Sequence, residues 1–125
     1  MSLCILATGK MTVLAVSAFT LSWTHSVEKT RWEEDWRVVP AGLEIVEARV
    51  RGSGAGMEPS EGAVLKDGWW TYRPEIGVRP VVKLAASGAT GGGWTLCTDK
   101  TCLELGAEAG SGVELSACAR AARSP

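Results

Sequence analysis

The stretch Phe19-Thr-Leu-Ser-Trp-Thr-His25 alternates apolar and polar residues without a break. In an extended chain its aromatic and aliphatic residues and His25 share one face, and the threonines and Ser22 share the other. This period of two is the cleanest in the sequence. It predicts a β-strand with one buried and one solvated face.

A second run, Trp32-Glu-Glu-Asp-Trp-Arg-Val-Val39, follows after a polar stretch. Its two tryptophans and Glu34 alternate with charged residues, which predicts a second strand whose buried face carries a carboxylate. A helix is the alternative, because Thr30 and Glu33 have the spacing of a capping box and the two indoles lie four residues apart. The segment is short and ends in Val-Val-Pro, so we favour the strand.

Short strands and tight turns account for most of the remaining chain. Asp67-Gly68 supplies the positive φ angles of a two-residue turn, so the flanking residues Val64 to Lys66 and Trp69 to Tyr72 are expected to form a hairpin. The other strand candidates are residues 3–7, 11–16, 43–51, 81–85, 94–97, 102–105 and 113–115. Many short strands without a long amphipathic helix predict an all-β fold, either an antiparallel sandwich or a partly open barrel.

Length and composition indicate one globular domain. The chain has 125 residues, of which 46% are hydrophobic and 22% charged, so it is neither disordered nor a polytopic membrane protein. We expect a β domain over residues 1–118 and a frayed tail over residues 119–125. The net charge of -1 and the absence of a basic run exclude nucleic acid as the expected partner. With a single histidine, His-rich metal sites are excluded, and we predict no metal and no cofactor.

The amino-terminal stretch has two interpretations. Residues 11–18 could be the apolar core of an export signal that ends at a Val-x-Ala cleavage site. This apolar run is very short, and the turn Thr8-Gly9-Lys10 before it favours a hairpin of the folded domain, formed by residues 3–7 and 11–16. The stretch is too polar for a transmembrane helix, so no transmembrane segment is expected. We expect a cytoplasmic protein, with an exported or periplasmic one as the alternative.

His25 and Glu34 are the leading site candidates, because both fall on the apolar faces of neighbouring strand candidates. If these strands pair, the two side chains come within contact distance in a pocket walled by Trp32 and Trp36. Since a buried carboxylate needs a partner, the pair could pin the fold, form a polar recognition point, or supply a general base. Ser26 faces the other side of the strand, so a Ser-His nucleophile is not expected.

The glycine-rich segment Gly52-Ser-Gly-Ala-Gly56 follows a strand, as phosphate-binding loops do. It lacks the Gly-Lys-Ser/Thr sequence, and Pro59 stands where a helix should begin. We therefore expect a loop that uses positive φ angles at its glycines, with an anion nest of backbone amides as the alternative.

Trp69 and Trp70 are consecutive in the predicted hairpin, so they point to opposite sides of the sheet. The Asp67-Gly68 turn pairs Lys66 with Trp69 and sends Trp70 inward. Trp69 then lies on the outer face beside the Lys66 stem, where it forms an interaction surface unless the tail or a second sheet covers it.

The four cysteines at positions 4, 97, 102 and 118 contain no Cys-x-x-Cys spacing, so zinc and thioredoxin-type chemistry are weakly supported. Cys97 and Cys102 are cross-strand neighbours if Asp99-Lys100 is the centre of their turn. A disulfide between them is then geometrically possible, and the redox state of the compartment decides whether it forms.

Three motifs together resemble the bacterial domain of unknown function 1850 family: His25-Ser26-Val27, Glu34 followed by Trp36, and Gly54-Ala55-Gly56-Met57. The resemblance covers about residues 2–105. It implies that His25, Ser26, Glu34, Gly54 and Gly56 belong to one shared feature. It also implies a small protein that is often encoded beside TAXI-type tripartite (TRAP) transporters, and many members carry an amino-terminal membrane anchor. No activity is assigned to the family, so the resemblance points to none.

The resemblance leads to a non-enzymatic accessory or binding module that works with TRAP transporter subunits. Two alternatives come from the residues alone. One is a small hydrolytic enzyme that uses His25 as base and Glu34 to orient it. The other is a protein–protein interaction domain that uses Trp69. Ligand identity and oligomeric state do not follow from the sequence.

Overall fold

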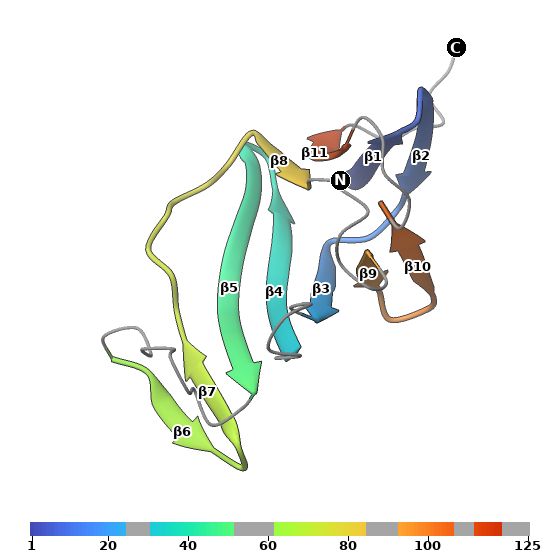
Figure 1. Ribbon diagram of the computed structural model, residues 1–125. Coiled ribbons are helices and arrows are strands. Elements are labelled where there is room, and N and C mark those ends of the chain that lie inside the picture. The colour runs from blue at the N-terminus through green and yellow to red at the C-terminus, as the bar shows by residue number, and fades with distance from the viewer. Residues whose placement is uncertain (25–30, 52–61, 85–92, 107–111, 119–125) are drawn as a thin grey trace.

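The computed structural model describes residues 1–24, 31–51, 62–84, 93–106 and 112–118, and every regular element within them is a strand. The strands are β1 (Ser2–Ala7), β2 (Lys10–Leu14), β3 (Ala18–Thr24), β4 (Arg31–Val39), β5 (Gly42–Arg51), β6 (Val64–Lys66), β7 (Trp69–Tyr72), β8 (Val81–Leu84), β9 (Trp94–Cys97), β10 (Cys102–Leu105) and β11 (Val113–Cys118). All their pairings are antiparallel, which confirms the predicted all-β class (Figure 1). Among the described segments there is no helix that could cross a membrane.

The strands form two open sheets. One has four strands in the order β2-β1-β11-β8, and the other has seven in the order β10-β9-β3-β4-β5-β7-β6. The four-stranded sheet lies at one end of the long strands β4 and β5 (Figure 1), where β5 contacts both β8 and β11. Because neither sheet closes on itself, the fold is an open two-sheet arrangement and not a closed barrel.

The core fills the space between these sheets. Side chains from alternate positions of β1 and β11 meet alternate positions of β3, β4 and β5, as the period of two requires. The buried cluster comprises Leu3, Ile5, Phe19, Leu21, Trp36, Val38, Leu43, Ile45, Ala48, Leu84, Leu96, Leu105, Val113 and Leu115. Phe19 and Leu21 of the predicted apolar face are therefore buried, and Trp23 is partly buried. The predicted solvated face is wrong at Ser22, which is also buried because β4 and β9 flank it on both sides.

The register of β3, β4 and β5 decides which side chains share a face. Leu21 pairs with Glu34, and Glu34 pairs with Ala48, so all three lie in one row across the sheet. The pairing of β4 with β5 shifts between Asp35 and Trp36, where Val46 is the extra residue. This bulge lets Ile45 and Ala48, three positions apart, both face the core.

A short backbone bridge connects the segment before β8 to the start of β5. The amide of Arg79 donates to the carbonyl of Leu43, and the amide of Leu43 donates to the carbonyl of Arg79, both at 2.8 Å. Gly42 makes this approach possible, because a Cβ at that position would collide with the Arg79 carbonyl oxygen. The φ of +148° at Gly42 is also unfavourable for other residues.

Two disulfides fasten the chain. Cys97 and Cys102 pair directly across β9 and β10 and are bonded, which confirms the geometry expected from their turn. The second bond joins Cys4 to Cys118 across a sequence separation of 114, and the sequence did not predict it. The last strand, expected over residues 113–115, continues to Cys118 because it pairs with β1 along its whole length.

Candidate functional site

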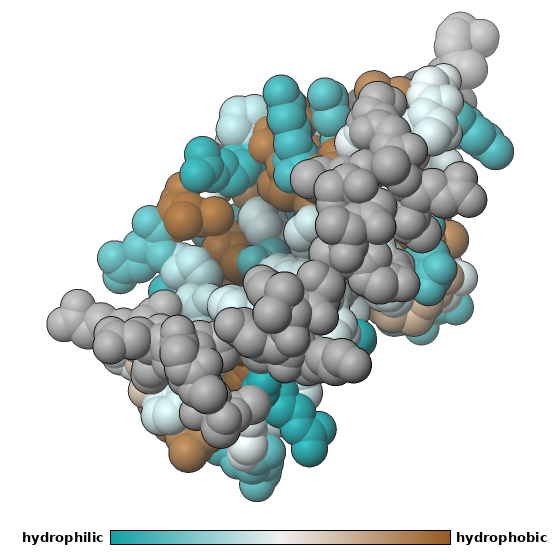
Figure 2. Space-filling view, viewed as in Figure 1, coloured by the Kyte–Doolittle hydropathy of each residue, from teal (hydrophilic) through white to brown (hydrophobic). Residues whose placement is uncertain are grey.

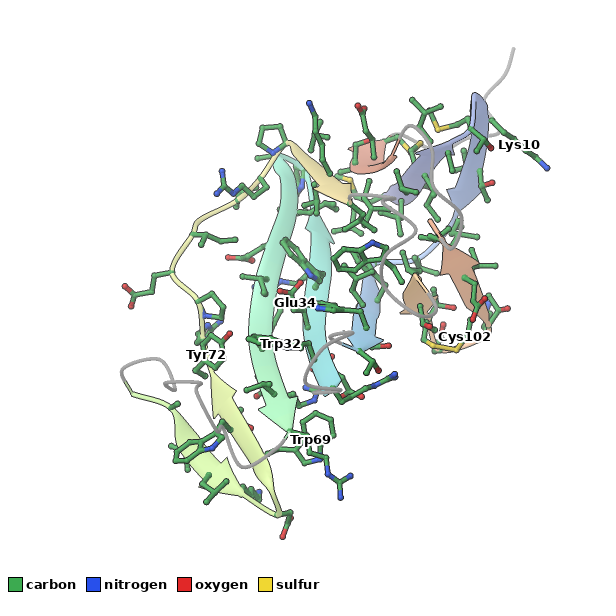
Figure 3. All side chains as sticks on the ribbon, in the orientation of Figure 1. Lys10, Trp32, Glu34, Trp69, Tyr72 and Cys102 are labelled. Atoms are coloured by element: carbon green, nitrogen blue, oxygen red, sulfur yellow. A yellow bond between two sulfur atoms is a disulfide. The ribbon has the colours of Figure 1, made fainter. Side chains whose placement is uncertain are left out.

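Alternate residues of β3 and β4 build the floor of the candidate site. Trp23 pairs with Trp32, Leu21 with Glu34, and Phe19 with Trp36, so these six side chains share the inner face of the seven-stranded sheet. Figure 3 shows Trp32 and Glu34 on this side of β4. The sequence places a carboxylate here because Glu34 keeps the same parity as the two tryptophans.

The Glu34 carboxylate lies among apolar groups and has one neutral donor. The indole Nε1 of Trp36 donates to Glu34 Oε1 at 2.9 Å, a contact between residues two apart on the same face. Burial raises the pKa of Glu34 above its usual value, and the hydrogen bond from Trp36 opposes this only in part. Among the ion pairs of the described residues, none includes Glu34. Its charge therefore lacks a cationic partner within that part of the chain.

Indole rings form the walls around this carboxylate. Trp23 stacks on Trp32 with ring centroids 5.9 Å apart and planes within 5°. Trp94, from the neighbouring strand β9, lies 4.7 Å from Trp23 at an angle of 51°. The two tilted rings make a corner whose faces carry the negative side of the aromatic quadrupole, a surface that attracts cations.

A cavity of about 390 Å³ opens above this floor. Its floor and walls are Leu21, Trp23, Glu34, Trp36 and Trp94, and its opposite side is formed by Ile76, Arg79 and the four residues of β8. Figure 2 shows apolar surface gathered at the segment that joins β7 to β8, beside a hollow. We call this cavity the Glu34 pocket. Its volume is in the range of small-ligand sites.

The outer face of the same sheet carries a network of paired charges. Arg49 donates to Glu33 and to Asp35 at 2.9 Å each, and to Glu47 at 3.0 Å. Thr20 donates to Asp35 at 2.8 Å. Burial raises the pKa of Asp35, but the hydrogen bonds from Arg49 and Thr20 outweigh it, and the net pKa is lowered.

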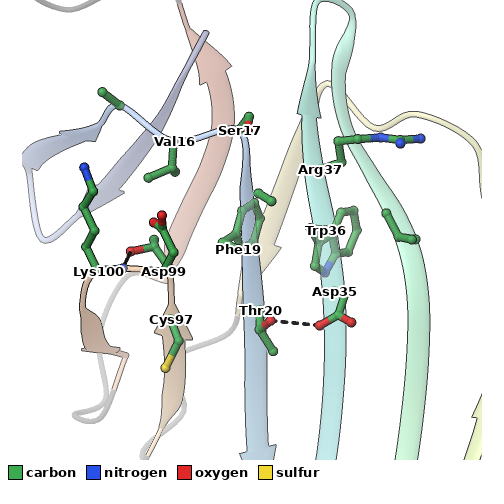
Figure 4. A pocket seen from close by; sticks show the side chains of 14 residues that line it. Val16, Ser17, Phe19, Thr20, Asp35, Trp36, Arg37, Cys97, Asp99 and Lys100 are labelled. Atoms are coloured by element: carbon green, nitrogen blue, oxygen red, sulfur yellow. Dashed lines mark hydrogen bonds between the residues drawn. The ribbon is translucent and has the colours of Figure 1, made fainter.

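A second, larger hollow of about 760 Å³ lies on this outer face, between residues 15–17 and the turn at Thr98–Lys100 (Figure 4). The bond from Thr20 to Asp35 crosses its floor, and Arg37 beside it is paired with Glu44 at 2.6 Å. These floor charges, Asp35 and Arg37, therefore already have partners. No cluster of three metal-ligating side chains occurs in the described ranges.

The structure brings together three of the residues expected at a site, Trp32, Glu34 and Trp36. The other four, His25, Ser26, Gly54 and Gly56, lie outside the described residues, and so does the expected proximity of the His25 and Gly52-to-Gly56 loops. The predicted contact between His25 and Glu34 therefore stays a prediction. The observed partner of Glu34 is Trp36.

Trp69 is half-buried, and the guanidinium of Arg51 lies 5.8 Å from its ring centroid. Lys66 pairs with Trp69 and is exposed, as the turn geometry predicts, while Trp70 pairs with Val50 on the inner face. Arg51 and Lys66, which lie opposite Trp69 on the two neighbouring strands, therefore cover part of the expected interaction surface.

Sequence reasoning missed Trp94 and the lining of the pocket by β8. Trp94 alternates with Leu96, which identifies a strand, but no local signal shows that β9 pairs with β3. The position of β8 depends on the Arg79 bridge to Leu43, two residues 36 positions apart in the numbering. Both features are set by contacts between distant parts of the chain.

A family model described as "Domain of unknown function (DUF1850)" matches residues 19–105. This match spans β3 to β10 and includes every described residue that lines the Glu34 pocket. No curated protein and no solved structure matches the chain.

Proposed function

Because the chain belongs to the DUF1850 family, whose description names no activity, we propose its function from the site: a non-enzymatic module that binds the positively charged end of an otherwise apolar ligand in the Glu34 pocket. One observation carries this proposal. A carboxylate without a described cationic partner lies in a cavity lined by indoles.

The chemistry of the pocket favours a cation. Burial disfavours the ionised form of Glu34, and a bound ammonium or guanidinium group would restore the favourable energy of that charge. The tilted faces of Trp23 and Trp94 add cation–π attraction. Arg79 and Lys83 also line the pocket but are exposed, so solvent and salt screen their repulsion more than they screen the attraction of the half-buried carboxylate.

Binding fits the site better than catalysis does. Trp36 holds Glu34 with an indole N–H, a group too weakly acidic to act as a general acid near neutral pH, so this contact orients the carboxylate without serving as a proton donor in catalysis. The hydrolytic alternative depends on His25, which lies outside the described residues.

The partner system follows from the resemblance and not from the geometry. The resemblance implies a protein encoded beside a TAXI-type TRAP transporter, and on that ground we place the module beside the subunits of such a transporter. Copurification of the native protein with transporter subunits, reduced by Glu34→Gln, would support this part. Recovery of the native chain without these subunits would contradict it.

We also place the protein in an oxidising compartment, outside the reducing cytosol. The support is that all four cysteines pair as disulfides, one of them between β1 and β11. Alkylation of the native protein before reduction should label no cysteine, and alkylation after reduction should label all four. Labelled cysteines before reduction would contradict the placement.

Tryptophan fluorescence tests the binding function with three probes of equal chain length: n-pentylammonium, n-pentanol and n-pentanoate. We expect the ammonium to bind most tightly and to lose about tenfold in affinity in Glu34→Gln, the factor typical of a lost charge-assisted contact. Glu104→Gln, at an exposed position of β10, controls for the lost charge. Equal affinity of the three probes, or no loss in Glu34→Gln, would contradict the proposal.

A further inference from the structure

The lining of the Glu34 pocket differs on its two sides. From β3 and β4 come residues two apart, Leu21 with Trp23 and Glu34 with Trp36, as expected where a pocket faces the surface of a sheet. From β8 come four consecutive residues, Val81 to Leu84. Consecutive residues point to opposite faces of a strand, so they share one cavity only where that cavity borders the backbone edge.

This edge of β8 is free within the described residues. β8 is the terminal strand of the four-stranded sheet, and its one strand partner is β11 on the other side. Before β8 begins, the backbone N–H and C=O of Arg79 are already paired with those of Leu43 in the bridge to β5. Beyond that bridge the edge borders the pocket, and no described strand pairs with its backbone N–H and C=O groups.

The rim beside this edge includes exposed apolar side chains next to the exposed Arg79 and Lys83. Ile76 and Val81 both line the pocket and are 43% and 41% exposed. Lys83, two positions after Val81 on the same face of β8, also lines the pocket and lies opposite Glu114 in the register. A partner that covers this rim gains hydrophobic burial in addition to backbone pairing.

We propose that the ligand of the Glu34 pocket is an extended segment of a partner protein, which adds as a strand to the free edge of β8 and directs a lysine or arginine side chain onto Glu34. This inference rests on the proposed function. Backbone pairing with β8 supplies affinity, and the pocket selects alternate side chains, as in other cases of strand addition.

The alternation of the added strand defines the sequence that fits. Every second side chain points to the indoles and Glu34, and the residues between them point to solvent. The segment therefore has a basic residue at the centre with apolar residues two positions before and after it. The apolar residues contact Ile76 and the indole walls, and the basic residue pairs with the carboxylate.

Selection from a phage-displayed library of random octapeptides tests this pattern on the intact disulfide-bonded chain. We expect peptides with a basic residue flanked by apolar residues at two positions on either side. They should be enriched on the wild-type protein and on the Glu104→Gln control but not on Glu34→Gln. Enrichment that is the same on Glu34→Gln as on the wild type would overturn the inference.

N-methylation of an enriched peptide tests the strand geometry. Adjacent N–H groups of a strand point to opposite edges, so methylation at one of two neighbouring central residues should weaken binding by about tenfold or more, and methylation at the other should be tolerated. Equal effects at both residues would overturn the pairing with β8.

The small probes separate this inference from the function on which it rests. If n-pentylammonium binds in a Glu34-dependent way while no peptide is enriched, the pocket is a cation site and the strand-addition inference fails alone. If neither the probe nor any peptide depends on Glu34, both proposals fail.

Discussion

Glu34 is the residue on which the account depends, because its carboxylate lies on a strand face where the residues two positions before and after it are tryptophans. Within the described part of the chain, the hydrogen bond from Trp36 at 2.9 Å orients the group without neutralising it. Burial raises the pKa of Glu34, so the ionised form is less stable in the folded protein than in the unfolded chain.

Replacement of Glu34 by glutamine should therefore stabilise the protein at pH 7. Protonation of Glu34 contributes fully to stability at pH values below 4.5, the pKa of the group in the unfolded chain. This contribution is lost as the pH rises through the higher pKa of the folded protein. The stability advantage of Glu34→Gln should accordingly be present at neutral pH and disappear as the pH falls below 4.5. Urea unfolding of both proteins across this range measures it, and a variant less stable than wild type at pH 7 would contradict the burial argument.

The hydrogen bond from Trp36 can be measured separately. Trp36→Phe keeps a ring on the core face but removes the donor, and we expect a loss of about 2–4 kcal/mol from the lost bond and the smaller ring. The same substitution in a Glu34→Gln background should cost about 1 kcal/mol less, because the bond there is no longer charge-assisted. Equal losses in both backgrounds would show that the bond does not act on the carboxylate.

At the scale of the elements, the site depends on how the β8 segment approaches β5. Gly42 permits the contact with Arg79, since any side chain there meets the Arg79 backbone. Gly42→Ala should destabilise the protein by about 2 kcal/mol or more and weaken ligand binding, because the bridge that places β8 beside the pocket is displaced.

Gly68→Ala is the matched control for that substitution. Gly68 also has a positive φ, of 85°, but a Cβ there meets no atom within 4 Å. It should cost about 1 kcal/mol from backbone strain alone and leave ligand binding unchanged. Thermal unfolding measures the stability of the two variants, and fluorescence titration measures their ligand binding. Equal effects on binding would contradict the claim that the bridge between Arg79 and Leu43 positions the Glu34 pocket.

Local sequence patterns predicted the elements well where one contiguous segment carries the information. The alternation from Phe19, the Asp67-Gly68 turn with φ values of 53° and 85°, and the bonded pair Cys97 and Cys102 all follow from residues within one hairpin. The bulge at Val46 did not follow, because its necessity appears only when both neighbouring strands are aligned.

The site was predictable in part. Trp32, Glu34 and Trp36 share one strand face, so the parity of a single segment identifies them. Trp94 and β8 come from elements far along the chain, and pairing between distant strands has no local signature. Four cysteines allow three pairings, so the bond from Cys4 to Cys118 could not be chosen from spacing alone.

At the scale of the whole molecule, the bond between Cys4 and Cys118 joins the first described strand to the last. A loop of this length restricts the unfolded chain strongly, so the double variant Cys4→Ala/Cys118→Ala should lose about 4–5 kcal/mol of stability on the chain-entropy estimate. The bond between Cys97 and Cys102 closes a much shorter loop, so the double variant Cys97→Ala/Cys102→Ala should lose only about 2 kcal/mol of stability. Chemical denaturation compares the two, and a larger loss from the short loop would contradict this ranking.

The most direct test of the central claim is the pKa of Glu34 itself, followed by the NMR shift of its side-chain carboxyl carbon with and without n-pentylammonium. The account predicts a pKa above the usual 4.5 in the free protein and a lower pKa when the cation is bound, because the bound charge favours the carboxylate. A pKa of 4.5 in the free protein that does not change with the cation would contradict it.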